Sequence, residues 1–373
     1  MELWERIGRR ISDDRNRLIV DENALNPAVR PDEPIGHGPI IERLLDVLDP
    51  AFSGSLPPSC HVYGPRGSGK SVLVANLFQL LSERFSPGDA PIVTTTRTTN
   101  VPRTEFVYVD ARGRTTFETL RGVLDALTDE TTPKRGISLD DIEWRLTDAV
   151  AATERTVLAI DHVSESRSGT IRDHLPANVP ISTVTVDRQP MDTADSTVRI
   201  PAYSSEALLD ILFTRASSGL SSNGLKYALT REIGDWAAGD ATKAITALYA
   251  AAIFAERDGA TNIGSEHVGE AIETTPDRCI HVETIASLHE SKQTVLDRFV
   301  TLNLSGTEID ESAESIAADV TLSEKTVKRH LYELAQDGVL TRIRTSGNGP
   351  GRPPTRLEPR FSPPVYRRLR GQD

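Results

Sequence analysis

Residues 64–71 have the sequence Gly-Pro-Arg-Gly-Ser-Gly-Lys-Ser, which matches the phosphate-binding pattern GxxxxGK[ST] at every fixed position. The stretch follows a predicted strand, Cys60–Tyr63, and opens a predicted helix, Ser71–Phe85. Glycines in such a loop let backbone N–H groups turn inward around phosphate oxygens. The sequence therefore predicts a nucleotide phosphate site formed by Gly64, Pro65, Arg66, Gly67, Ser68, Gly69, Lys70 and Ser71.

The chemistry of the bound nucleotide is assigned to a few side chains. We expect Lys70 to reach the β- and γ-phosphates of ATP, or the β-phosphate of ADP, and the Ser71 hydroxyl to bind Mg²⁺. A second metal ligand is needed at the end of another strand, and Asp161 follows the buried strand Thr156–Ile160. His162 comes next. Either His162 acts as the catalytic base, or the site binds ATP and hydrolyses it slowly or not at all.

Strand and helix patterns alternate around this motif. Alternating β and α elements predict a mostly parallel sheet between two helical layers, which is an α/β P-loop domain over residues 1–200. The predicted strands are Cys60–Tyr63, Glu105–Asp110, Thr156–Ile160 and Ile181–Val186, and the predicted helices are Ile40–Leu48, Ser71–Phe85, Thr116–Leu127 and Asp140–Ala151.

From residue 201 to residue 280 the pattern is helical throughout. Apolar residues recur at helical spacing in Ser204–Ser218, Gly224–Ala238, Thr242–Asp258 and Ser265–Thr274. This stretch predicts a separate all-α domain.

Residues 281–373 predict a third domain. Two helices, Ser291–Leu304 and Glu311–Asp319, precede a turn and a third helix, Glu324–Asp337, with Ser323 as its N-cap. Two short strands, Val339–Arg344 and Thr355–Leu357, follow, which completes a winged-helix pattern. In a DNA groove, the third helix and the wing would present Lys325, Thr326, Lys328, Arg329, Arg342, Arg344 and Arg352.

Charge is distributed unevenly along the chain. Residues 321–373 contain eleven Lys or Arg and five Asp or Glu, so they carry +6, and residues 1–320 carry −18. A basic module on an acidic body favours a partner that is a polyanion, and we expect double-stranded DNA. The alternative is that the basic module packs on the helical domain or on a partner protein.

Composition excludes several other classes of protein. The 373 residues include no apolar run of 18 or more, so we expect no transmembrane helix, and Met1–Arg17 has no signal-peptide core. Cys60 and Cys279 fit no metal or disulfide framework, which favours a reduced, cytoplasmic protein. Acidic residues are abundant and only seven lysines occur, which indicates either salt adaptation or a simply acidic protein.

The order of these motifs resembles the archaeal origin-recognition and cell-division-control initiator family of AAA+ ATPases. The resemblance covers about residues 20–360 and is carried, beside the P-loop, by residues 32–48 (DEPIGHGPIIERLLDVL), 133–146 (PKRGISLDDIEWRL), 201–215 (PAYSSEALLDILFTR) and 239–244 (GDATKA). It implies that Ile35 borders the adenine and that Tyr203 opens a lid domain. It also implies that Arg215 contacts phosphate, with a surface salt bridge as the alternative role.

The sequence also departs from the family at positions that matter. His37 stands where the family has arginine, and His162 stands where it has glutamate. The second-sensor arginine falls on Thr242, and the first-sensor residue falls at or near Asp187. Thr242 has no cation to offer a γ-phosphate. The resemblance therefore identifies a divergent member and supports nucleotide binding better than turnover.

Three functions remain open at this point. The resemblance implies an ATP-dependent protein of replication initiation that binds origin DNA. It also implies a role in helicase loading, and it implies other initiator subunits and a replicative helicase as protein partners. A nucleotide-sensing winged-helix regulator of transcription or plasmid maintenance would use the same parts. An active ATPase motor is the third, and the absent glutamate and arginine weigh against it.

Overall fold

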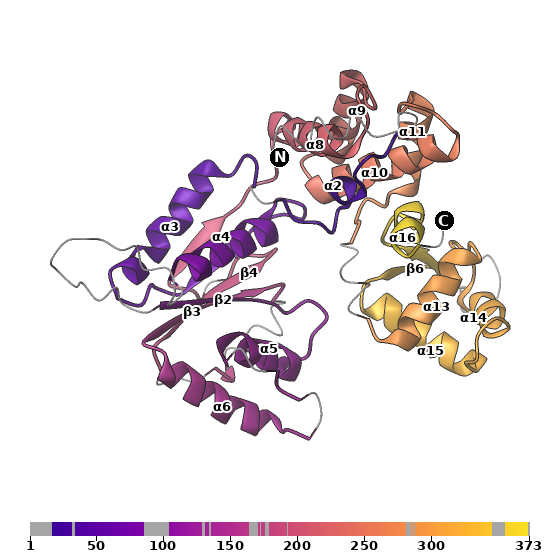
Figure 1. Ribbon diagram of the computed structural model, residues 1–373. Helices are drawn as coiled ribbons and strands as arrows, with labels where there is room; N and C mark the ends of the chain where they lie inside the picture. Colours follow the sequence, from indigo (N-terminus) through magenta and orange to yellow (C-terminus); the bar gives the residue numbers. More distant parts are fainter. Residues whose placement is uncertain are drawn as a thin grey trace. The chain divides into compact units, whose positions relative to one another are not determined.

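The computed structural model describes residues 17–31, 34–85, 104–128, 131–133, 136–163, 171, 173–175, 179–191, 193–280, 285, 288–344 and 355–371. The chain divides into two compact units (Figure 1). One unit is Pro31–Ala202, and the other joins the segment up to Arg30 with the chain from Tyr203 onward. Within these ranges, every helix is too short or too polar to cross a bilayer.

A parallel sheet of five strands forms the centre of the unit Pro31–Ala202, in the order β2-β3-β4-β1-β5. In register, Asp110 lies beside Asp161 and Tyr63 beside Asp187, so the carboxyl ends of neighbouring strands meet at one edge. The parallel sheet confirms the predicted fold class. The strands are β1 (Cys60–Tyr63), β2 (Thr104–Asp110), β3 (Arg155–Asp161), β4 (Ile181–Asp187) and β5 (Ser196–Arg199).

Helices cover both faces of this sheet (Figure 1). α3 (Gly38–Phe52) and α4 (Lys70–Phe85) pack on one face, where Leu44 and Phe78 are buried against Val62 and Val157. α5 (Thr116–Thr128) and α6 (Leu139–Ala152) pack on the other face, and their apolar stripes form a second core. The result is the three-layer arrangement that the alternating pattern predicts.

The helical domain consists of α8 (Ser205–Gly219), α9 (Tyr227–Ala237), α10 (Ala241–Arg257) and α11 (Ser265–Thr274). Every residue of α10 from 241 to 255 is buried, so this helix is the core of the domain. A short helix, α2 (Glu22–Leu25), packs on α8, and the preceding backbone N–H of Val20 donates to the Gly219 carbonyl at 2.8 Å. Residues 17–30 thus pack with the helical domain, whereas the sequence-based division placed them with the P-loop domain.

The C-terminal domain has the predicted helix-turn-helix followed by a hairpin. α13 (Glu290–Thr301), α14 (Ile309–Ala317) and α15 (Glu324–Gln336) enclose a core with β6 (Leu340–Arg344) and β7 (Thr355–Pro359), which pair antiparallel. The Ser323 side chain accepts from the Thr326 N–H, so it is the N-cap that the sequence predicts. A further helix, α16 (Pro363–Leu369), was not predicted, and its Tyr366 is fully buried in this core.

Charged side chains connect α16 to the helical domain. Arg368 donates to Glu22 and, through Nη2, to Oε2 of Glu256 at 3.1 Å. The Tyr249 hydroxyl donates to Oε1 of Glu22 at 2.6 Å, and the Ile19 backbone N–H donates to Oε1 of Glu256 at 3.2 Å. We call Glu22, Tyr249, Glu256 and Arg368 the linking cluster, because it joins α2, α10 and α16.

Candidate functional site

The loop between β1 and α4 has the backbone that a phosphate-binding loop needs. Gly67 and Gly69 have φ values of 63° and 79°, a region that side chains other than glycine rarely adopt. Gly64 has no room for a side chain, because a Cβ there would lie 2.0 Å from the carbonyl oxygen of Ile200. The helix begins at Lys70, so its first N–H groups point toward the loop.

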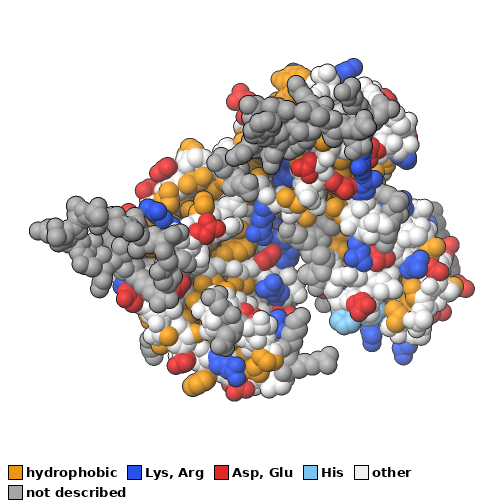
Figure 2. Space-filling view, viewed as in Figure 1, with side chains coloured by type: hydrophobic (Ala, Val, Ile, Leu, Met, Phe, Trp, Pro, Cys, Tyr) orange, Lys and Arg blue, Asp and Glu red, His pale blue; other side chains and the backbone are white. Residues whose placement is uncertain are grey.

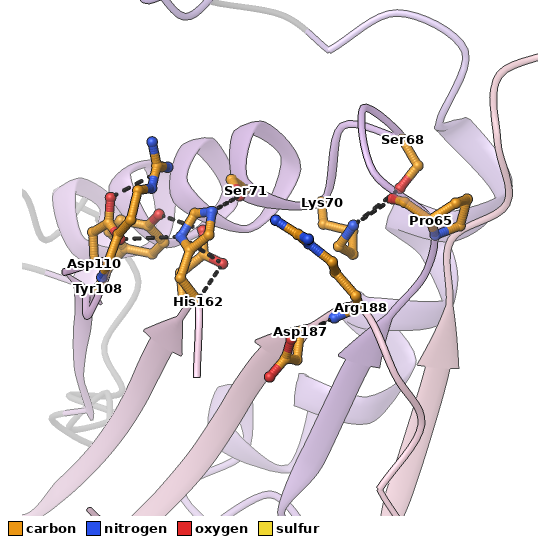
Figure 3. A network of polar contacts seen from close by, with 11 residues as sticks. Pro65, Ser68, Lys70, Ser71, Tyr108, Asp110, His162, Asp187 and Arg188 are labelled. Carbon is orange, nitrogen blue, oxygen red and sulfur yellow. Dashed lines mark hydrogen bonds and ion pairs between the residues drawn. The ribbon is translucent and has the colours of Figure 1, made fainter. Parts of the chain in front are cut away.

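Lys70 is held over this loop (Figure 3). Its Nζ donates to the Pro65 carbonyl at 2.6 Å and lies 3.4 Å from Oγ of Ser68. Only 9% of the residue is exposed. A buried ammonium beside a glycine-rich loop at a helix N-terminus favours the binding of an anion here.

Asp161 ends β3 beside the P-loop and is 1% exposed. Its Oδ2 accepts the Tyr108 hydroxyl at 2.8 Å, and its Oδ1 accepts the His162 backbone N–H at 2.7 Å. A carboxylate held in this way keeps lone pairs for a cation. Together with the Ser71 hydroxyl it offers the hard oxygen donors that Mg²⁺ takes at a nucleotide site.

The side chain of His162 lies between two elements of the site (Figure 3). Its Nδ1 is 3.0 Å from Oδ1 of Asp110, at the end of β2, and its Nε2 is 3.5 Å from Oγ of Ser71. His162 also has a φ of 60°, which is uncommon for a residue with a side chain. This backbone conformation accompanies the return of the imidazole toward the P-loop. Asp110 and Tyr108 were not among the site residues predicted from the sequence.

Burial by itself would raise the pKa of Asp110, but other groups lower it well below the usual range. The hydrogen bond from His162 and its charge act first, followed by Arg112, whose Nη2 lies 3.4 Å from Oδ2 of Asp110. Asp110 is therefore an ionised carboxylate at neutral pH. Its charge stabilises the Nδ1–H of His162.

The end of β4 holds the residue expected near the first sensor. Burial raises the pKa of Asp187, against the opposing hydrogen bond from the Arg188 backbone N–H at 2.6 Å. Arg188 is exposed, and Figure 3 shows its side chain extending toward Lys70 and Ser71. Arg188 was not among the site residues predicted from the sequence, although its position directly after a predicted strand was a usable signal.

The segment before the P-loop lies against it. His37 is 3% exposed and hydrogen-bonds the Ser68 backbone, and burial lowers its pKa. Ile35 is half-buried two residues earlier, next to Gly36, whose φ is 79°. The structure thus brings His37 to the P-loop, and the assignment of Ile35 to the adenine stays a prediction.

Tyr203, Arg215 and Thr242 belong to the other unit. Arg215 is a structural residue there, because its guanidinium donates to the carbonyls of Ala24 (3.1 Å), Asn26 (3.2 Å) and Val29 (2.7 Å). These partners replace the surface salt bridge offered as its alternative role. Burial raises the pKa of Tyr203 to about 12.

Within residues 239–244, no cation takes the place of the second-sensor arginine that Thr242 replaces. Thr242 is buried, and the side chain of the next residue, Lys243, contacts neighbouring residues of the same domain. Lys243 Nζ lies 2.7 Å from Oδ1 of Asp277 and 4.0 Å from the ring centre of Trp236.

The third helix of the C-terminal domain presents cations with different partners. Lys328 forms an ion pair with Asp310, and Arg329 Nε lies 3.6 Å from Oε1 of Glu333. Lys325 is exposed, and no ion pair joins it to another described residue. The Thr326 hydroxyl is 2.9 Å from the N-cap Oγ of Ser323. Acidic and basic side chains are interspersed over the visible face of this domain in Figure 2, and ion pairs also join Lys292 to Asp337 and Arg298 to Asp319.

The wing is described only in part. The Arg342 guanidinium lies over the Tyr332 ring, 5.6 Å from its centre, which places both on the exposed side of α15 and β6. Arg344 ends β6, and its side chain lies outside the described residues, as does all of Arg352.

The last three arginines of the chain, Arg367, Arg368 and Arg370, all contact other residues of the same unit. Arg367 donates to the Val300 carbonyl at 3.0 Å, and Arg370 pairs with Asp297 at 2.8 Å. With Arg368 in the linking cluster, part of the C-terminal positive charge holds domains together. The charge excess therefore overstates what is available to DNA.

Two domain families match separate parts of the chain. Residues 33–177, which include the P-loop and Asp161, match the AAA ATPase domain. Residues 209–273, which include Thr242, match the Cdc6 AAA+ ATPase-type lid domain. A P-loop unit followed by this lid defines an ATPase of the AAA+ class.

Similar proteins of known name narrow the assignment within the AAA+ class. The ORC1-type DNA replication protein 1 of Sulfurisphaera tokodaii is 25% identical over 363 residues, covering 88% of this chain and 86% of the relative. The ORC1-type DNA replication protein 9 of Halobacterium salinarum is 26% identical over 275 residues, covering 71% and 74%. The solved structure of the Aeropyrum pernix ORC1 protein in complex with DNA shares the fold, with a TM-score of 0.61 and 20% identity over 95% of this chain and 97% of the other.

The matched domains and these relatives confirm the resemblance to the archaeal origin-recognition and cell-division-control initiator family of AAA+ ATPases.

Proposed function

We propose that this protein is an ATP-binding initiator of DNA replication that recognises double-stranded origin DNA. The observation that carries the proposal is one chain combining a complete P-loop with a helix-turn-helix that exposes Lys325 and Arg329. Its relatives are named ORC1-type DNA replication proteins, and one neighbour of the same fold was solved with DNA. Both support the proposal.

The nucleotide half of the proposal places ATP or ADP on Gly64–Ser71. Mg²⁺ would be held by Ser71 and Asp161 together with phosphate oxygens, and it would neutralise phosphate charge. Hydrolysis would be slow or absent. His162 replaces the expected glutamate and its Nδ1 is engaged by Asp110, while Thr242 supplies no cation.

The DNA half of the proposal assigns α15 to the major groove. Lys325 and Arg329 would meet phosphates or base edges, with Thr326 and Lys328 beside them, and Arg342, Arg344 and Arg352 would follow the wing. ATP and ADP would act as a switch only if they stabilise different arrangements, because a ligand shifts an equilibrium by its differential affinity. Other initiator subunits and a replicative helicase are the protein partners we infer, in the cytoplasm.

Binding to labelled duplex DNA tests the proposal. Fluorescence anisotropy would be measured with ATP, ADP and no nucleotide across a salt series, for the wild type and Lys70→Ala. We expect sequence-selective binding that depends on the nucleotide, and loss of that dependence in Lys70→Ala. Binding sites in cells should cluster at replication origins. Clustering at promoters would favour a transcription regulator instead, and nucleotide-independent binding would contradict the switch.

A further inference from the structure

The loop that follows β4 lies at the middle of the nucleotide edge of the sheet. β4 pairs with β1 on one side and with β3 on the other. Tyr63 is in register with Asp187, so Gly64 and Arg188 are the first residues beyond their strands at this edge. Asp161 lies across from Val186 on the other side. Arg188 therefore leaves the sheet between the P-loop and the metal-binding acid.

A buried histidine fixes this loop. His61 is 0% exposed, and its Nε2 is 2.7 Å from the carbonyl oxygen of Gln189. Its Nδ1 lies 2.8 Å from Oγ1 of Thr185, so both ring nitrogens have a partner. Because a carbonyl only accepts, Nε2 donates to it. The backbone of residues 188–189 is thus held at both ends, by His61 and by the side chain of Asp187.

The side chain of Arg188 extends from this fixed backbone toward the P-loop. Figure 3 shows its guanidinium lying between Ser71 and Lys70, above the strand ends. The residue is exposed, and no carboxylate of a described residue forms an ion pair with its guanidinium. An arginine in this position can pair with an anion that enters the loop.

We propose that Arg188 contacts the γ-phosphate of ATP and so distinguishes ATP from ADP. The inference rests on the proposed nucleotide binding by Gly64–Ser71. A guanidinium presents paired N–H donors that match phosphate oxygens and stays charged at all relevant pH values. Thr242, in the lid, carries no charge for this purpose. Arg188 supplies the cation from the P-loop unit itself, so ATP sensing in this chain does not depend on a lid arginine.

Nucleotide titrations of the full chain test this role. Calorimetry would compare ADP with a non-hydrolysable ATP analogue, both with Mg²⁺, for the wild type, Arg188→Ala and Arg188→Lys. We expect Arg188→Ala to weaken the ATP analogue by roughly tenfold or more, the range for a charged hydrogen bond, and to change ADP less than about twofold. Arg188→Lys should lie between, because it keeps the charge without the paired donors.

A matched control removes the same charge elsewhere. Arg84 is exposed in the last turn of α4, roughly 20 Å along the helix from Ser71. Arg84→Ala should leave both affinities at the wild-type values. Thermal unfolding of Arg188→Ala should match the wild type, since the side chain is exposed.

The possible results distinguish a failure of the Arg188 role from a failure of nucleotide binding itself. If the wild type binds ADP and ATP, and Lys70→Ala lowers both affinities, nucleotide binding stands. Equal affinities in Arg188→Ala and wild type would then overturn the role of Arg188 alone, and so would an equal loss for ATP and ADP. If the wild type binds neither nucleotide, both proposals fall.

Discussion

Nδ1 of His162 lies 3.0 Å from Oδ1 of Asp110, where Asp110 ends β2 and His162 directly follows the adjacent strand β3. An ionised carboxylate only accepts hydrogen bonds, so Nδ1 carries the proton. The other ring nitrogen faces the Ser71 hydroxyl at 3.5 Å. The imidazole is therefore oriented by Asp110 toward the residue assigned to Mg²⁺, which differs from the task of a glutamate that polarises water.

Replacing His162 with glutamate should raise ATP hydrolysis. His162→Glu supplies a carboxylate that can accept the proton of attacking water, and positioned bases contribute about 10²–10⁴-fold to such steps. We expect at least a tenfold rise in multiple-turnover phosphate release. His162→Gln is the control, since it keeps a polar side chain without a base. Equal rates in all three proteins would mean that another missing group limits turnover.

Acid should remove the contribution of Asp110 to stability. Its pKa is lowered in the folded state, mainly because His162 outweighs the effect of burial, so its stabilisation is complete above the unfolded value of about 4 and lost as the pH falls below it. Asp110→Asn should lower the unfolding temperature at pH 6, by about 2–4 °C per kcal/mol lost. Thermal scans should show the gap closing below about pH 4. A gap that is constant with pH would contradict the ion pair.

Breaking the linking cluster should loosen α16 from the helical domain. Arg368→Ala removes the guanidinium that Glu22 and the 18%-exposed Glu256 share and leaves Glu256, among the described cations, with only the more distant Arg17, at 3.7 Å, a loss of about 1–3 kcal/mol. Hydrogen exchange should rise in both α10 and α16. Arg370→Ala is the matched control, because Arg370 pairs with Asp297 inside the C-terminal domain. If the two variants show the same exchange pattern, the cluster does not join the domains.

DNA affinity should depend more on Lys325 than on Lys328. Lys328 is paired with Asp310, and that carboxylate competes with phosphate for its charge, whereas Lys325 is exposed. Lys325→Ala should reduce the slope of log affinity against log salt by about 0.9, the value for one lost phosphate contact. Lys328→Ala should reduce it less. Equal and negligible effects would place DNA on another surface.

The main features of the fold were predictable because their local signals are strong. The P-loop follows a strand and opens a helix, as its spacing requires. β5 was missed because four residues, Ser196–Arg199, with one fully buried side chain give no clear pattern. α16 was missed because it begins at two prolines and is rich in arginine, which resembles an unstructured tail.

The site was predictable only in its contiguous parts. Gly64–Ser71 and Asp161 follow from motif and strand position. Asp110 and Arg188 each follow a strand too, but which strands are neighbours is decided by three-dimensional packing that the sequence does not state. The hydrogen bonds from Arg215 to backbone carbonyls could not be predicted, because the partner residues lie 186–191 positions earlier in the sequence.

The linking cluster has a consequence for the order in which the protein is made. Glu22 is among the first described residues to be synthesised, and Arg368 among the last. The sheet, built from Pro31–Ala202, is complete early and can fold while the ribosome is still translating the rest. Residues 17–30 must wait for α8 and α10, and α16 arrives later still. A nascent chain would thus hold a finished P-loop unit well before its DNA-binding domain is secured.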